Sequence, residues 1–156
     1  MDYISIHSPV GDITLFEDNA SIIALNGGWA GGQEHASTPL LTETIRQLSA
    51  YFTGALTVFD IPLAPSGTSF QRGVYQQIRQ IPYGNTRTYG EIALLSNTSP
   101  RPVGNVCGRN PIPIIIPCHR VLGAGRLGGY SGPGGVEMKL HLLRLEGIPP
   151  KDLSRR

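Results

Sequence analysis

Hydrophobic and polar positions alternate along the first part of the chain with the period of two that is typical of a half-buried strand. Three alternating runs lie at about residues 3–6, 13–15 and 22–25, and turn-forming segments at residues 9–12 and 17–19 separate them. Short turns between neighbouring strands favour antiparallel pairing. The pattern therefore predicts a small antiparallel meander.

The hydrophobic period then changes to that of a helix. Pro39 stands where a helix can begin, and apolar residues recur every three or four positions as far as Phe52. Residues 57–69 contain prolines and a glycine, and they predict a strand followed by a linker. We place a domain boundary there, between an N-terminal α/β unit at residues 1–65 and a C-terminal unit at residues 66–156.

Helical periods dominate the second unit, so the fold class of the whole chain is predicted to be α+β. Helices are expected at about residues 70–80, 89–95, 101–108 and 136–145. Thr88 and Glu91 have the spacing of a capping box at the start of the second of these, and Pro102 lies in the first turn of the third, where proline is tolerated. A small polar turn joins these two short helices, which is the pattern of a helix-turn-helix.

Charge is divided unevenly between the two halves of the chain. Residues 1–69 hold one basic residue and seven acidic ones, whereas residues 70–156 hold twelve basic residues and four acidic ones. A strongly basic half is suited to binding a polyanion such as nucleic acid. Many helix pairs resemble a helix-turn-helix, and charges can segregate on a solvated surface, but the two signals together favour a nucleic-acid partner.

An apolar run at residues 112–116 ends at Pro117-Cys118-His119-Arg120-Val121. The run predicts a buried strand or extended segment that ends in a proline-fixed turn. On spacing alone, a cysteine there is most simply a small buried hydrophobe. The imidazole of His119, the glycine-rich loop that follows and the carboxylate of Glu146 favour instead an activated nucleophile, because only the thiolate attacks well.

Length and composition exclude several other classes of protein. A chain of 156 residues with 40% hydrophobic content can build one domain or two small ones around a real core. Two cysteines are no disulfide framework, and a free thiol suits the reducing cytosol. No apolar stretch approaches the ~18 residues that span a bilayer, and the acidic start at Asp2 indicates no cleavable signal sequence. We expect a cytoplasmic protein without membrane contact.

Several longer motifs point to one family. The segment RNPIPIIIPCHRV, followed by GYSG and LLRLEG and preceded by FQRGVYQQIRQIPYGNTRTYGEIA and RPVGNVCGRN, resembles the O6-alkylguanine-DNA alkyltransferases, which repair alkylated guanine in DNA. The resemblance is close over about residues 66–148 and loose over the first 65. It implies a ribonuclease H-like N-terminal unit and a winged-helix-like C-terminal unit that binds DNA and carries the catalytic site.

The resemblance implies an irreversible, single-turnover transfer of an alkyl group from O6-alkylguanine in duplex DNA to Cys118. Glu146 and His119 match a water-bridged relay to the cysteine. Asn110 matches a residue that hydrogen-bonds to the backbone and joins the recognition helix, at about residues 101–108, to the turn that carries Cys118. A turn histidine and an ordinary helix-ending asparagine are the simpler alternatives. Glu146 ends a helix, where the dipole disfavours a carboxylate, and this indicates a specific partner.

Two further residues match positions that extrude the damaged base from the duplex. Arg101 matches the arginine that fills the space left by the flipped nucleotide, and Tyr89 matches the tyrosine that assists its rotation. A phosphate contact or a solvated side chain is the alternative for Arg101, and a core tyrosine is the alternative for Tyr89.

The loop after the cysteine matches the segment that closes over the flipped base. It comprises Tyr130, Ser131 and Gly132, with Ser131 donating a hydrogen bond toward the guanine O6. The backbone carbonyls of Cys118 and Val121 match the groups that read the exocyclic amine. O4-alkylthymine is left open as a further substrate.

The chain departs from the family in few places. Some members bind zinc in the N-terminal unit, but residues 1–69 hold no cysteine and only His7 and His35, so we expect no metal and no cofactor. Pro102 and Asn105 occupy positions of the recognition helix where the family commonly has small residues. The expected partner is double-stranded DNA containing O6-alkylguanine, bound by a monomer in the cytoplasm, with cooperative binding left open.

Two rival functions remain at this stage. A non-catalytic sensor of alkylated bases would use the same surface, but related sensors replace the cysteine that is present here as Cys118. A cysteine hydrolase would turn over a small substrate repeatedly and would have no use for a basic helix-turn-helix.

Overall fold

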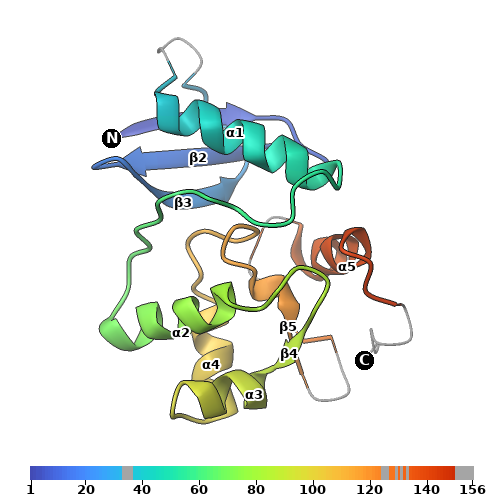
Figure 1. Ribbon diagram of the computed structural model, residues 1–156. Helices are drawn as coiled ribbons and strands as arrows, with labels where there is room; N and C mark the ends of the chain where they lie inside the picture. Colours follow the sequence, from blue (N-terminus) through green and yellow to red (C-terminus); the bar gives the residue numbers. More distant parts are fainter. Residues whose placement is uncertain (33–36, 124–126, 129, 131, 133, 150–156) are drawn as a thin grey trace.

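The computed structural model describes residues 1–32, 37–123, 127–128, 130, 132 and 134–149 (Figure 1). Three strands, β1 (Asp2–Ile6), β2 (Ile13–Asp18) and β3 (Ser21–Gly27), form an antiparallel sheet in the order β1-β2-β3. The predicted meander is therefore confirmed. Leu15 of the central strand pairs with Ile4 on one side and Leu25 on the other, and this row faces the core with Leu15 completely buried.

Helix α1 (Pro39–Phe52) packs along this sheet (Figure 1). The hydroxyl of Thr38 caps it by accepting a hydrogen bond from the Leu41 backbone N–H at 3.0 Å. Proline fits the first turn, since an N–H there would lack a partner within the helix. The helix has the bounds that the hydrophobic period predicts.

The second half of the chain is mainly helical, as predicted. It contains α2 (Ser69–Arg79), β4 (Arg87–Thr88), α3 (Tyr89–Leu95), α4 (Pro100–Cys107), the 3-10 turn η1 (Cys118–Arg120), β5 (Val121–Leu122) and α5 (Gly135–Leu145). The expected capping box at the start of α3 is present, with reciprocal bonds between Thr88 and Glu91. Helices α3 and α4 lie next to each other, and β4 and β5 form a short parallel pair nearby (Figure 1).

Two predicted strands are absent from the described residues. Residues 112–116 are buried but irregular, with Ile114 in the left-handed region at φ 76°. Prolines at positions 111, 113 and 117 lack the N–H groups that a strand ladder needs, so the segment folds on itself instead. In residues 57–68, an isolated bridge between Ile22 and Leu63 forms instead of a strand, and Ile61 is buried in the core.

One hydrophobic core extends across both halves of the molecule. Buried residues of the sheet and of α1 belong to the same cluster as Ile78 of α2, Val103 of α4 and the apolar run before Cys118. The Leu25 backbone N–H also donates to the Pro111 carbonyl at 2.9 Å. The sheet and α1 therefore support the segment that leads to the cysteine.

Candidate active site

Asn110 braces the segment that carries Cys118. Its side-chain amide donates to the Ile116 carbonyl at 2.9 Å and accepts from the Ile112 N–H at 3.0 Å. The Cys118 N–H in turn donates to the Ile116 carbonyl at 2.7 Å. An asparagine side chain can supply both a donor and an acceptor, which is what an irregular buried segment requires. The bracket holds Cys118 at the start of η1, with only 4% of its surface exposed.

His119 and Glu146 form a buried hydrogen-bonded pair beside this cysteine. Nε2 of His119 lies 2.7 Å from Oε2 of Glu146, and both side chains are completely inaccessible to solvent. An ionised carboxylate can only accept, so the imidazole must carry a proton on Nε2. In the neutral ring, Nδ1 is then an acceptor. This atom is buried and has no hydrogen-bond partner in the part of the chain that the structure describes.

Glu146 is held as a carboxylate by an unusually complete set of donors. Arg120 donates from Nε to Oε1 at 2.8 Å and from Nη2 to Oε2 at 3.1 Å. The Tyr51 hydroxyl donates to Oε2 at 2.6 Å, and the Gly84 N–H donates to Oε1 at 3.2 Å. Burial raises the pKa of a carboxyl, but the bonds from His119 and the charge of Arg120 outweigh it and lower the pKa of Glu146 to about 2.

His119 rests as a neutral ring. Complete burial lowers the pKa of His119, and the charges of Arg120 and Lys139 act in the same direction, while the bond to Glu146 opposes them. A neutral imidazole with a free acceptor nitrogen is the form that can take a proton from a thiol.

Lys139 is a buried cation on the same side of the molecule. Its ammonium donates to the Val121 carbonyl at 2.8 Å and lies 5.9 Å from the centre of the Tyr89 ring. Burial lowers the pKa of Lys139 to about 8, while the two thiols nearby act to raise it. Gly128 packs against this pair, since a Cβ atom at position 128 would lie 2.9 Å from the Tyr89 hydroxyl. The structure thus brings Tyr89 and Val121 together through a lysine.

The predicted base-closing loop is described only in part. The Tyr130 hydroxyl is buried and has no partner among the described residues, and burial raises the pKa of this phenol, so it stays protonated. Gly132 lies against the Tyr130 ring, because a Cβ atom there would come within 2.4 Å of Cζ. Ser131 lies outside the described residues.

Arg101 is exposed in the first turn of α4. Asn105 follows four residues later, so the two side chains share one face of the helix. Arg109 is also exposed just after the helix and lines a shallow hollow with Asn105. These side chains are exposed, whereas the side chains around Glu146 are buried.

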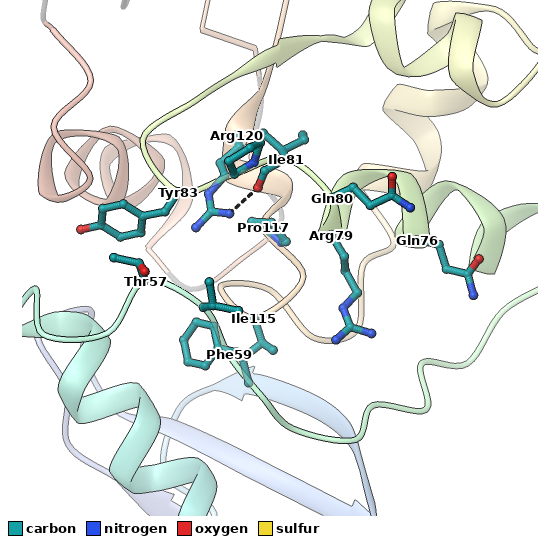
Figure 2. A pocket seen from close by; sticks show the side chains of 12 residues that line it. Thr57, Phe59, Gln76, Arg79, Gln80, Ile81, Tyr83, Ile115, Pro117 and Arg120 are labelled. Atoms are coloured by element: carbon teal, nitrogen blue, oxygen red, sulfur yellow. Dashed lines mark hydrogen bonds between the residues drawn. The ribbon is translucent and has the colours of Figure 1, made fainter.

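A hollow of about 520 Å³ lies beside the active-site turn (Figure 2). Residues 57–59, the end of α2 and the turn itself line it, and Figure 2 shows the Arg120 guanidinium donating to the Ile81 carbonyl, a bond of 2.7 Å. Pro117 and Arg120 contribute to its wall, but Cys118 is not among the described residues that do. The hollow therefore exposes the back of the turn rather than the sulfur.

Neither a metal cluster nor a membrane span is found within the described ranges. No group of three or more His, Cys, Asp or Glu side chains there could hold a metal ion. No described helix is both long enough and apolar enough to cross a bilayer.

Two family models match the chain and together span nearly all of it. Residues 1–65 match the model described as 6-O-methylguanine DNA methyltransferase, ribonuclease-like domain. Residues 69–148 match the model described as 6-O-methylguanine DNA methyltransferase, DNA binding domain. The chain belongs to the 6-O-methylguanine DNA methyltransferase family. The family that the PCHR segment and its flanking motifs indicate is thereby confirmed.

Three members of this methyltransferase family are similar to the chain over almost their whole length. A methylated-DNA–protein-cysteine methyltransferase of Methanosarcina acetivorans is 44% identical, over 94% of this chain and 99% of that protein. A crystal structure of Mycobacterium tuberculosis OGT in complex with DNA is 40% identical, covers 99% of this chain and 96% of that one, and superposes with a TM-score of 0.83. An O6-methylguanine DNA methyltransferase from Methanococcus jannaschii is 28% identical, covers 94% of each chain and gives a TM-score of 0.66. The α+β fold class is confirmed.

Three residues of this methyltransferase site escaped sequence reasoning: Tyr51, Arg120 and Lys139. Arg120 follows His119 directly, and its place in a buried motif was a usable signal. Lys139 lies three residues before Leu142 on the apolar face of α5, where an uncompensated ammonium is costly, so its position already implied a partner. Tyr51 gave no local signal, because its partner lies 95 positions further along the chain.

Proposed function

We propose that this protein repairs DNA by transferring an alkyl group from the O6 atom of guanine in duplex DNA to the sulfur of its own Cys118. The observation that carries the proposal is the buried Cys118–His119–Glu146 cluster at the end of the PCHR segment. The cluster supplies a nucleophile, a neutral base and a charged carboxylate that orients the base, and membership of the methyltransferase family supports this chemistry.

The transfer step follows from the protonation states of the cluster. His119 takes the thiol proton of Cys118, and the bond of its Nε2–H to Glu146 stabilises the imidazolium that forms. The thiolate attacks the alkyl carbon, a carbon–sulfur bond forms and the carbon–oxygen bond breaks. The electron pair passes to the guanine, which takes up the proton and becomes the normal base. A thioether has no hydrolysis route here, so each chain reacts once.

Access to the alkylated oxygen requires the base to leave the stack. Extrusion costs a few kcal/mol, least for a poorly paired lesion. In this proposal Arg101 enters the duplex from the exposed start of α4, and Tyr89 assists rotation of the nucleotide. Tyr130, Ser131 and Gly132 close over the flipped base.

The carbonyls of Cys118 and Val121 read the exocyclic amine of that base. The bond from Lys139 to the Val121 carbonyl supports this role, because it fixes the peptide group in place. Asn110 acts through the backbone, by bracing the turn that presents the cysteine.

The proposed partner is double-stranded DNA that contains O6-alkylguanine, bound through the helix-turn-helix of α3 and α4. The basic balance of residues 70–156 supports this partner. The proposed working form is a monomer in the cytoplasm, where the two buried cysteines remain in the thiol form. No metal or cofactor takes part in the proposed reaction.

The intact mass of the protein tests this function. After incubation with excess duplex containing one O6-methylguanine, the mass is expected to rise by one methyl group per chain and then to remain constant. Peptide mapping should place the methyl group on Cys118. Continued turnover beyond one equivalent, or a methyl group on Cys107, would refute the proposal.

Glu146→Gln is expected to slow transfer at least about thirtyfold. The substitution weakens the proton transfer from Cys118 to His119, and general base catalysis of this kind usually contributes about a hundredfold or more to a rate. Glu146 is ionised above about pH 2 and raises the pKa of His119 against the effect of burial. Removing the charge lets that pKa fall further, which makes His119 a poorer base throughout the neutral range. The measurement is the rate of Cys118 alkylation by O6-benzylguanine as a function of pH. Glu137→Gln, an exposed carboxylate in the first turn of α5, is the matched control and should react like wild type. Equal rates in the two variants would remove Glu146 from the mechanism.

A further inference from the structure

One side chain from the N-terminal unit reaches the catalytic cluster. Tyr51 lies in the last turn of α1, is completely buried, and donates its hydroxyl to Oε2 of Glu146 at 2.6 Å. The hydroxyl oxygen of Tyr51 also lies 3.5 Å from Nε2 of His119. The Tyr51 ring is itself fixed, because it packs at centroid distances of 5.3 Å against Phe59 and 6.2 Å against Tyr83. The hydroxyl is therefore delivered to Glu146 by a rigid support.

Oε2 of Glu146 is shared between three donors that compete for its position. His119 lies at 2.7 Å and Tyr51 at 2.6 Å, whereas Nη2 of Arg120 lies at 3.1 Å. The other half of the arginine pair, from Nε to Oε1, is shorter at 2.8 Å. A guanidinium fork matches a carboxylate with two parallel bonds, and an unopposed pair tends to close evenly. The bond on the Oε2 side is the longer of the two, and this is the oxygen that Arg120 shares with His119 and Tyr51.

We propose that Tyr51 is a positioning residue of the alkyl-transfer reaction, whose hydroxyl keeps Oε2 of Glu146 on His119 instead of on Arg120. The inference rests on the proposed function, since it concerns the rate at which Cys118 is alkylated. Tyr51 would thereby let the N-terminal unit influence the reaction indirectly, through Glu146 and His119.

The groups around Glu146 allow the hydrogen bond from Tyr51 to be removed without a change in charge. Within the described part of the chain, the titratable and charged groups that face Glu146 are His119 and Arg120 from η1, Tyr51 from α1 and Tyr83 from the loop before β4. The Tyr51 hydroxyl is neutral, because burial and the neighbouring carboxylate both raise the pKa of this phenol. Removing the hydroxyl leaves the number of charged groups around Glu146 unchanged and takes one hydrogen-bond donor away from Oε2.

Tyr51→Phe tests the inference in the full-length protein. With O6-benzylguanine, which requires no base flipping, the first-order rate of alkylation at saturation is expected to fall about tenfold, similar to the smaller losses seen when a hydrogen-bond partner behind a metal-ligating histidine or carboxylate is removed. The half-saturating concentration and the affinity for duplex DNA should not change. The ¹⁵N and ¹H resonances of the His119 Nε2–H group should shift toward those of a weaker hydrogen bond. A rate and a spectrum equal to those of wild type would overturn the inference.

Thr44→Val is the matched control for loss of a buried hydroxyl from the same helix. Thr44 is completely buried, and its hydroxyl donates to the Leu40 carbonyl at 2.7 Å rather than to the catalytic cluster. This variant should keep the wild-type rate even where its melting temperature falls. Equal slowing in both variants would mean that packing, and not the bond to Glu146, sets the rate, and the inference would be wrong.

A second substitution keeps the test decisive if Tyr51→Phe does not fold. Replacing Tyr51 with 4-aminophenylalanine retains a donor at the same place, but an aromatic amine donates more weakly than a phenol. The expected rate is lower than that of wild type, with the same half-saturating concentration. A rate equal to or above that of wild type would overturn the inference. A wild-type protein that transfers no alkyl group would refute the proposed function, whereas wild-type transfer that is unaffected by these changes would refute the role of Tyr51 alone.

Discussion

Replacing Cys118 with alanine is expected to abolish alkyl transfer and to leave the affinity for duplex DNA nearly unchanged. The sulfur is the atom that forms the new bond, and loss of a nucleophile commonly costs more than about 10⁴-fold in rate. Cys107 does not replace it, because burial and the proximity of Cys118 raise the pKa of Cys107 to about 12 and keep that thiol protonated. Transfer of a labelled methyl group and fluorescence anisotropy with the same duplex measure the two properties.

Cys107→Ala is the matched control for this change. It removes a second buried thiol from the same hydrophobic core, so it should reproduce any loss of stability while keeping one equivalent of transfer. Labelled methyl groups on the Cys118→Ala protein, or loss of transfer in Cys107→Ala, would contradict the assignment of Cys118 as the acceptor.

Arg101→Ala is expected to slow transfer from duplex DNA about a hundredfold, because an unsupported extrusion costs a few kcal/mol and each 1.4 kcal/mol is about a factor of ten. Reaction with free O6-benzylguanine should change little, since that substrate needs no extrusion. Arg101 is exposed at the start of α4, away from the buried bonds of Glu146, so its loss should not disturb the cluster. Single-turnover rates with the two substrates measure the effect.

Two neighbouring substitutions define what Arg101 contributes. Arg101→Lys keeps the attraction to phosphate but lacks the planar fork, so it should restore duplex transfer only in part. Arg109→Ala removes another exposed arginine just beyond the same helix and should weaken DNA binding without a separate loss at saturating duplex. If Arg101→Ala slowed the reactions with both substrates equally, Arg101 would support the fold or the pocket, and the proposal that it acts in extrusion would be wrong.

Local patterns were sufficient to predict most of the fold. The alternation of residues 3–6, 13–15 and 22–25 predicts the three strands, and the helical period and proline of residues 39–52 predict α1 with its observed bounds. Thr88 and Glu91 predict where α3 begins, because a capping box is satisfied within one turn of chain. These predictions are confirmed because the interactions that decide them join residues close together in the sequence.

The segment before Cys118 shows where local reasoning failed. The apolar run of residues 112–116 predicts a buried strand or extended segment, but the prolines at positions 111, 113 and 117 remove donors of a ladder, and Ile114 adopts a left-handed backbone at φ 76°. The bonds that stabilise this shape come from the side chain of Asn110. A resemblance to a family indicated that asparagine, whereas a hydrophobic pattern could not.

The donors around Glu146 were beyond sequence reasoning for a different reason. Tyr51, Gly84 and Arg120 come from three separate segments, and no spacing along the chain relates them to position 146. Gly84 and Arg120 reach Glu146 through the folding of the C-terminal unit, whereas Tyr51 reaches it because α1 packs against that unit. The dipole argument correctly indicated that the carboxylate of Glu146 has specific partners, but it could not identify them.

The burial of Cys118 also bears on which molecules the protein ignores. A chain that reacts only once is lost whenever a small electrophile or an oxidant reaches its sulfur, so selectivity against such reagents matters more here than in an enzyme that recovers. With 4% of its surface exposed, Cys118 offers little to a small reagent that does not bind in the site. A flat base inserted from DNA brings its own binding energy and can reach a site that stays closed to smaller reagents. The burial of the sulfur thus slows side reactions at Cys118, so each molecule stays active for longer before it meets a lesion.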